Sequence, residues 1–243
     1  GKMAAPTKVE FAVQMTCQSC VDTIQNALET QEGIKSVQIN LAQEQVIVES
    51  TLTTTDVQRL IEATGRTAVV TGLGSASEKK HLGAAVSMIG GSSIQGVVRM
   101  VQSDADLCII EGTVDGLQPG GHSIAIHELG DLSKGCESCG DIFNPDNRNK
   151  KIYGSLGNIT ANERGRATFR FENPTVKVWD IIGRSMMVKD DAETTKRLAC
   201  GIIARSAGLF QNSKKICACD GVTLWDERNV PLAGDGRSRA AKI

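Results

Sequence analysis

Apolar side chains in the first third of the chain recur with two different spacings. Alternation typical of β-strands covers residues 8–14, 36–42, 44–50 and 67–72, and helical spacing covers residues 20–31 and 54–65. Gly33 follows the first helical segment and Gly65 ends the second, as glycines commonly do at helix ends. The order strand–helix–strand–strand–helix–strand predicts a ferredoxin-like α+β domain over residues 1–73.

The pattern changes after residues 74–83, a stretch rich in Gly, Ser and Lys that is typical of a linker. Short β-type runs then cover residues 84–89, 94–102, 107–114, 122–128, 166–171, 180–188 and 200–205. Turn-forming Gly, Asp, Asn and Pro separate these runs, which favours an all-β antiparallel sandwich or barrel over residues 84–208. Residues 209–243 contain few apolar side chains, so we expect a short, largely irregular tail.

Composition narrows the classes of function. The 243 residues carry a formal net charge of −1, which argues against nucleic-acid binding because phosphate recognition needs an excess of cations. No apolar run approaches the ~20 residues that span a bilayer, and the first ten residues lack the apolar core of a signal peptide. We therefore expect a cytoplasmic protein without stable membrane insertion. Six of the eight cysteines form three close pairs, which without a signal peptide indicate metal or redox sites.

The first pair, Cys17 and Cys20, lies between the first predicted strand and the first predicted helix. Free backbone N–H groups and the dipole at a helix start stabilise thiolates. Two thiolates at this spacing favour a soft ion of low coordination number, and Cu(I) fits that description. Zn(II) prefers four ligands, and the segment offers no further pair of Cys or His. A chance pair or a thioredoxin-like redox pair is the alternative.

Met15 and Thr16 precede this pair, and the element order is ferredoxin-like. On these grounds residues 1–73 resemble the heavy-metal-associated domain of copper chaperones and copper ATPases. The resemblance implies that Cys17 and Cys20 bind Cu(I). Met15 is expected to anchor the loop in the core rather than to act as a ligand, because buried methionines are usually packing residues.

Residues 84–205 resemble Cu,Zn superoxide dismutase, an eight-stranded Greek-key barrel. The motifs PGGHSIAIHELG, GCESCGDIFNP, GSLGNITANERGRATF and RLACGIIA carry the resemblance. Most of that family's metal ligands are replaced: Ala125, Ile142 and Lys189 stand at copper-ligand positions, and Ile152 and Ser155 at zinc-ligand positions. His127 matches a copper ligand, and His122 matches a histidine that bonds the backbone. One imidazole cannot hold a redox copper ion, so we expect no dismutase-type catalytic residues and no zinc in this domain.

The resemblance also implies a disulfide between Cys136 and Cys200. Cys139 is an addition that forms a second close pair with Cys136. Two interpretations stay open: Cys136 alternates between Cys200 and Cys139, or Cys139 is a free thiol that packs in the core. Cys108, inside a predicted strand, is expected to be an inert core residue.

The dimer face of the dismutases is retained as well. Apolar residues or glycines occupy its positions, namely Val86, Met88, Leu129, Gly130, Ile182, Gly183 and Ile202. Such residues suit a close two-fold contact. A barrel that keeps this face and loses its metal ligands is expected to recognise a partner, as a heterodimer or a homodimer.

The tail carries Cys217 and Cys219, which in principle bind a soft ion or exchange disulfides. A heavy-metal-associated domain, a dismutase-like domain and a CxC tail, in that order, resemble the family of copper chaperones for superoxide dismutase. The resemblance implies a metallochaperone and not an enzyme. It would take Cu(I) from a copper importer or other copper donor, deliver it to Cu,Zn superoxide dismutase and promote the target's disulfide.

The same resemblance implies a cytoplasmic protein with a fraction in the mitochondrial intermembrane space. Three alternatives are kept: a superoxide dismutase with a fused copper-acquisition domain, a thiol–disulfide oxidoreductase to which copper is incidental, and a plain protein-interaction module.

Overall fold

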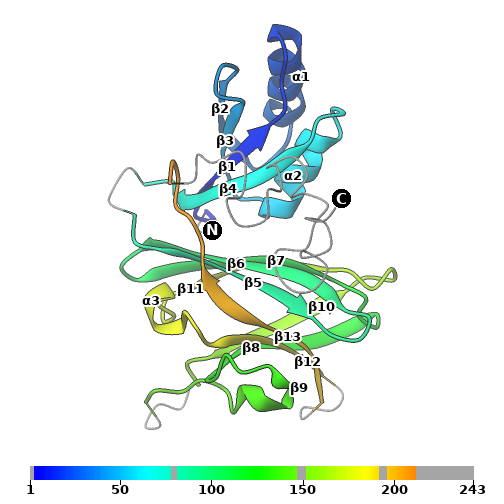
Figure 1. Cartoon of the computed structure of the whole chain (residues 1–243), viewed down its shortest axis with the longest axis vertical. Helices are drawn as coiled ribbons and strands as arrows, with labels where there is room; N and C mark the ends of the chain where they lie inside the picture. The colour runs from blue at the N-terminus through cyan, green and yellow to red at the C-terminus, as the bar shows by residue number, and fades with distance from the viewer. Residues whose placement is uncertain (1–2, 78–80, 147–151, 192–195, 212–243) are drawn as a thin grey trace, which may run out of the picture. The chain divides into compact units, whose positions relative to one another are not determined.

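The computed structural model describes residues 3–77, 81–146, 152–191 and 196–211. The chain divides into two compact units (Figure 1). The first contains the predicted ferredoxin-like region, and the second contains the predicted barrel.

The ferredoxin-like unit has the predicted βαββαβ order. Its elements are β1 (Thr7–Val13), α1 (Gln18–Glu29), β2 (Ile34–Asn40), β3 (Gln45–Ser50), α2 (Thr54–Glu62) and β4 (Ala68–Ser75). The strands form one antiparallel sheet in the order β2-β3-β1-β4, so β1 is central. The side chains of Phe11 and Val13 on β1 and of Ile24 and Ile61 on the helices are fully buried. This apolar core holds the segment after β1 in place, which is where the first cysteine pair lies.

The second unit is a closed eight-stranded barrel, as the resemblance implied. Its strands are β5 (Ala84–Gly90), β6 (Gln95–Asp104), β7 (Leu107–Asp115), β8 (Gly120–His127), β10 (Ser155–Ala161), β11 (Ala167–Asn173), β12 (Ser185–Asp190) and β13 (Arg197–Arg205). Their order around the barrel is β10-β11-β7-β6-β5-β13-β12-β8. The short strand β9 (Ser133–Cys136), the 3-10 helix η1 (Glu137–Cys139) and the helical turn α3 (Val178–Ile181) lie in the connections.

Two details of the apolar pattern were misread. Strand β10 was missed because only Ile159 and Ala161 are buried along it, and Ser155, Gly157 and Asn158 give it the composition of a turn. The run 180–188 is not one strand. It divides into α3 and β12 at Gly183, whose φ of 82° is a left-handed conformation that glycine adopts readily.

The unit boundaries also differ from the predicted ones. Strand β4 continues to Ser75, beyond the expected boundary at residue 73. Residues from Ala207 onward group with the ferredoxin-like unit, although the barrel was expected to extend to residue 208. Ala5 groups with the barrel, where its N–H donates to the Glu172 carboxylate at 2.5 Å.

Candidate metal site and partner-binding face

The two thiols of the first cysteine pair lie side by side at the start of α1. Cys17 is the N-cap residue, with an extended backbone and no side-chain capping hydrogen bond. Its Sγ lies 3.6 Å from the Sγ of Cys20. Cys17 is exposed, whereas Cys20 is 3% exposed and packs toward the core. Met15 is buried at 4% exposure. The pair therefore presents one accessible and one sheltered sulfur.

Hydrogen bonds stabilise both sulfurs as thiolates. The Ser19 hydroxyl, 3.0 Å from the Cys17 sulfur, is the largest cause that lowers the pKa of Cys17 to about 6, followed by the backbone N–H of Cys20. Hydrogen bonds with the backbone of Thr16 and Cys17 lower the pKa of Cys20. With a pKa of about 6, the Cys17 sulfur is mostly thiolate near neutral pH and is available to a soft cation.

The ligand count favours a low coordination number. No group of three or more His, Cys, Asp or Glu positioned for one metal ion occurs among the residues that the structure describes. Two adjacent thiolates suit Cu(I), which accepts soft sulfur ligands at low coordination number, better than Zn(II).

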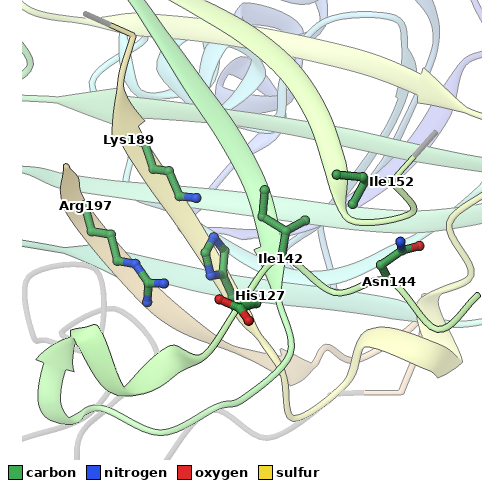
Figure 2. A pocket seen from close by; sticks show the side chains of 7 residues that line it. His127, Ile142, Asn144, Ile152, Lys189 and Arg197 are labelled. Atoms are coloured by element: carbon green, nitrogen blue, oxygen red, sulfur yellow. The ribbon is translucent and has the colours of Figure 1, made fainter. Parts of the chain in front are cut away.

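The corresponding metal region of the barrel holds a cavity of about 400 Å³ with cationic side chains (Figure 2). His127, Asp141, Ile142, Asn144, Ile152, Lys189 and Arg197 line it. His127 is fully buried, and its Nδ1 lies 2.9 Å from the Gly140 carbonyl oxygen. Its Nε2 has no hydrogen-bond partner within the described part of the chain. Ile142 and Lys189 stand beside it where further ligands would be needed.

Charge in this cavity opposes a bound cation. Burial is the largest cause that lowers the pKa of His127, and Lys189 and Arg197 lower it further. Burial and Arg197 also lower the pKa of Lys189, against the opposing effect of Asp141.

Other replaced ligand positions offer no ligand set either. Ala125 is buried, and Ser155 and Ile152 are exposed. His122 lies with its Nε2 2.7 Å from the Gln118 carbonyl oxygen, a backbone contact of the kind that the resemblance implied.

A disulfide joins Cys136 to Cys200, across a sequence separation of 64. Cys139 is a fully buried free thiol that packs in one cluster with both half-cystines and Met187. Its sulfur lies 3.5 Å from the Asp131 carbonyl oxygen. The arrangement places a third sulfur beside the bond. Cys108 is also fully buried, and burial raises its pKa to about 12.

The residues predicted for the partner face lie on neighbouring segments of the barrel. Met88, Leu129 and Ile202 are 48%, 49% and 43% exposed, although all three are apolar. A Cβ on Gly201 would overlap the Met88 carbonyl, and one on Gly130 would overlap the Gly183 carbonyl, so the backbones approach closely. The Gly183 N–H donates to the Ile203 carbonyl at 2.8 Å, which joins the segment around Gly183 to β13. Val86 and Ile182 are half-buried beside them.

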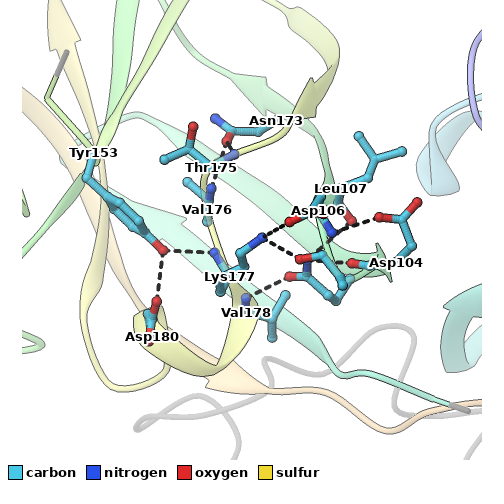
Figure 3. Close-up of polar contacts among 12 residues, drawn as sticks. Asp104, Asp106, Leu107, Tyr153, Asn173, Thr175, Val176, Lys177, Val178 and Asp180 are labelled. Atoms are coloured by element: carbon cyan, nitrogen blue, oxygen red, sulfur yellow. Dashed lines mark hydrogen bonds and ion pairs between the residues drawn. The ribbon is translucent and has the colours of Figure 1, made fainter.

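Sequence reasoning missed Trp179 on α3, which is 55% exposed. The available signal was the place of this Trp, three positions before the predicted face residue Ile182. Polar contacts fix the backbone before it (Figure 3). The Lys177 N–H donates to the Tyr153 hydroxyl at 2.8 Å, and the Val178 N–H donates to the Gln102 side chain at 2.9 Å. The segment that carries Trp179 is therefore held against the barrel.

Cys217 and Cys219 lie outside the described residues. Within the described part of the chain, no helix has the length and apolarity needed to cross a membrane.

Comparison with known proteins matches both units. Residues 10–68 match the Heavy-metal-associated domain, and residues 94–203 match Copper/zinc superoxide dismutase (SODC). A protein of Rattus norvegicus named Copper chaperone for superoxide dismutase is 50% identical, over 96% of this chain and 93% of its own length. The protein of that name from Homo sapiens is 46% identical, over 100% and 96%. A Superoxide dismutase 1 copper chaperone of Debaryomyces hansenii is 31% identical, over 95% and 98%.

Proposed function

The chain belongs to the copper chaperones for superoxide dismutase, and from that premise we propose that it carries Cu(I) on Cys17 and Cys20 and delivers it to an immature Cu,Zn superoxide dismutase subunit. It is a metallochaperone rather than an enzyme, like the relatives whose names it matches. Copper is the cargo, and the dismutase is the partner.

The observation that carries the proposal is the sulfur pair at the start of α1. Two sulfurs 3.6 Å apart, with lowered pKa values, supply two thiolates without a third protein ligand among the described residues. An under-coordinated, partly exposed Cu(I) can be passed on by ligand exchange: an incoming thiolate binds as one of the two leaves. Free copper is never released in such a step.

The exposed apolar face of the barrel is the proposed docking surface. Burying Met88, Leu129 and Ile202 against the equivalent face of an immature dismutase gives a heterodimer, and the same face allows a homodimer. Exposed Trp179 at the neighbouring turn extends this face, since Trp is enriched among the residues that dominate binding energy.

The tail pair, Cys217 and Cys219, is proposed to receive copper and to promote the target's disulfide. A target thiolate attacks a Cys217–Cys219 disulfide and forms a mixed disulfide, and the second target thiolate then displaces the tail. Two electrons pass from the target to the tail pair. Dioxygen reoxidises the tail by accepting two electrons and two protons as hydrogen peroxide.

In the barrel, we propose that Cys139 exchanges with the Cys136–Cys200 disulfide, because its sulfur packs in the same cluster. The Cys139 thiolate attacks Cys136, so that the Cys136–Cys139 bond forms, the Cys136–Cys200 bond breaks and Cys200 leaves as the thiolate. We place the chaperone in the cytoplasm, with a fraction in the mitochondrial intermembrane space, and a copper importer or other donor loads it.

The test is dismutase activity after anaerobic mixing and a subsequent, timed exposure to dioxygen. The Cu(I)-loaded chain is assayed alone and with metal-depleted, disulfide-reduced Cu,Zn superoxide dismutase supplied with zinc. We expect no activity from the chain alone and activity with the partner. A chain with Cys17→Ser and Cys20→Ser serves as the matched control and should deliver no copper.

Activity of the chain alone would support the alternative, a dismutase with a fused copper-acquisition domain. Oxidation of the partner's thiols with no copper delivered by the Cu(I)-loaded chain would support a thiol–disulfide oxidoreductase. Failure to bind Cu(I) at all would leave an interaction module.

A further inference from the structure

The sheet of the ferredoxin-like unit buries a carboxylate on the face opposite its helices. Val9, Phe11 and Val13 of β1 are buried in the helix-side core, and side chains alternate along a strand, so Glu10 points to the other face. Glu10 is only 3% exposed. A glutamate is almost never buried this deeply unless its oxygens are bonded. Something must therefore cover and satisfy it.

The cover is the segment 207–211, which follows the last barrel strand and groups with this unit. The Phe210 N–H donates to Glu10 Oε2 at 2.8 Å, and the Thr71 hydroxyl donates to Glu10 Oε1 at 2.7 Å. The Leu73 N–H of β4 donates to the Ala207 carbonyl at 3.0 Å. Figure 1 shows this segment, the orange end of the coloured chain, running beside β4.

Two glycines of β4 make room for it. A Cβ on Gly72 would lie 2.6 Å from the Gly208 carbonyl oxygen, and a Cβ on Gly74 would lie 2.8 Å from Cγ of Leu209. Neither glycine has a positive φ, so no turn requires it. Glycine inside a strand weakens the strand and often marks a close approach of another backbone. Because they lack side chains, Gly72 and Gly74 leave a groove on β4 that the segment 207–211 occupies.

We propose that this groove is a binding site for residues 207–211 that anchors the tail to the copper-binding unit. The inference rests on the proposed function. Six residues, 211–216, separate Phe210 from Cys217, so the fully extended chain places Cys217 within about 25 Å of the anchor. The anchor therefore shortens the tether across which copper passes, within one chain, from Cys17 and Cys20 to the tail pair.

The transfer step needs no oxidant. A tail thiol loses its proton and its thiolate binds Cu(I), while a thiolate of the first pair leaves and takes up a proton. The anchor contributes proximity: a short flexible tether gives millimolar effective concentration, which decreases as about the −3/2 power of tether length. Without the anchor, the tether also includes the linker 77–83 and residues 207–210, about three times as much chain. We expect a loss of about fivefold in the transfer rate.

The first measurement is amide hydrogen exchange of Leu73 and Phe210 in the full chain. Both amides should be protected, and Gly74→Val should remove the protection of Phe210 by displacing Leu209. Because a change in β4 also risks weakening the sheet, Leu209→Ala is the second variant. Phe210→Ala is the matched control: that side chain is 68% exposed, and the substitution keeps the bonded N–H. Unprotected amides in the unmodified chain would overturn the anchor.

The second measurement is activation of metal-depleted dismutase by mixed chains. One chain lacks Cys17 and Cys20, and the other lacks Cys217 and Cys219. At about 10 µM, the mixture should be about 100-fold slower than the unmodified chain, given a millimolar effective concentration. Gly74→Val and Leu209→Ala in the unmodified chain should slow transfer about fivefold.

The failures are distinguishable. Full activity after Cys217→Ser and Cys219→Ser overturns the relay and the tail's proposed role. A normal requirement for the tail pair, with Gly74→Val and Leu209→Ala at full rate, overturns the anchor alone.

Discussion

The acidity of Cys17 gives the sharpest prediction about the copper site. The pKa of about 6 means that about half of Cys17 is thiolate at pH 6 and about 90% at pH 7. An ordinary thiol with a pKa of 9.0 would be about 1% thiolate at pH 7. The Ser19 hydroxyl is the largest cause of the shift. Removing it with Ser19→Ala should raise the pKa by about one unit, since the backbone hydrogen bonds remain.

We therefore expect the alkylation rates of Cys17 in the unmodified chain and in Ser19→Ala to cross when they are plotted against pH. At pH 6 the variant has about one-fifth as much thiolate, but a more basic thiolate is intrinsically about threefold more nucleophilic. Alkylation of Cys17 should then be about twofold slower at pH 6 and about threefold faster above pH 8. The assay is iodoacetamide modification of the reduced, metal-free chain, followed by peptide mapping that isolates Cys17 from the other cysteines.

Gln18→Ala is the control for this prediction. Gln18 lies in the same turn, and its amide donates to Asp22 at 3.0 Å rather than to a sulfur. Its profile should overlay that of the unmodified chain. A midpoint near 9 in the unmodified chain would refute the reasoning, and a midpoint unchanged in Ser19→Ala would assign the shift to the helix start instead.

Three further predictions concern the barrel. The double variant Met88→Ala with Ile202→Ala removes two half-exposed side chains, each worth about 1 kcal/mol of binding free energy, so calorimetry should show about 30-fold weaker binding to metal-depleted dismutase. Leu82→Ala, which removes an exposed apolar side chain that is not part of the proposed face, is the control and should leave binding unchanged. Reducing the Cys136–Cys200 bond should lower the free energy of unfolding by roughly 4 kcal/mol in urea titrations at matched pH. The pKa of His127 is lowered in the folded chain, so as the pH decreases the unfolded chain binds a proton at this residue before the folded chain does. The urea concentration at the unfolding midpoint should therefore decrease from pH 7 to pH 5, and it should decrease less in the variant His127→Gln.

Most of the fold could be predicted because its strands and helices are amphipathic. The helix that follows the first cysteine pair has Ile24 and Leu28 on one face, and that spacing alone defines it. Strand β10 could not be found in this way, because its extended conformation depends on pairing with β8 along Gly157 to Ala161 rather than on an alternating pattern. β-propensity does not identify a strand whose stability comes from its neighbours in the sheet.

In the candidate sites too, the local feature could be predicted from the sequence and the long-range contact could not. Cys17 and Cys20 are three positions apart in sequence, so their spacing already indicates two ligands for one ion. The anchor joins Glu10, Gly72 and Phe210, which lie far apart along the chain. The sequence pattern puts Gly72 at the end of a predicted strand and Gly74 in the predicted linker 74–83, and only the close approach of Gly208 and Leu209 explains them. Sequence patterns report local periodicity, and this contact has none.

In the described part of the barrel, the replaced ligand positions leave no group of three or more His, Cys, Asp or Glu that would compete for copper, as the proposed delivery requires. A copper carrier must keep its cargo on exchangeable ligands, and a complete set of imidazoles in the barrel would retain the ion. Lys189 preserves the buried strand β12 while placing a cation beside His127, and Ile142 fills a second ligand position with an apolar side chain. The barrel is closed with these replacements in place, and the proposed docking face is formed by other residues, Met88, Leu129 and Ile202 among them. The sulfurs of Cys17 and Cys20 are then the best copper ligands that the described residues offer, which supports the proposed exchange between thiolates as the route to the partner.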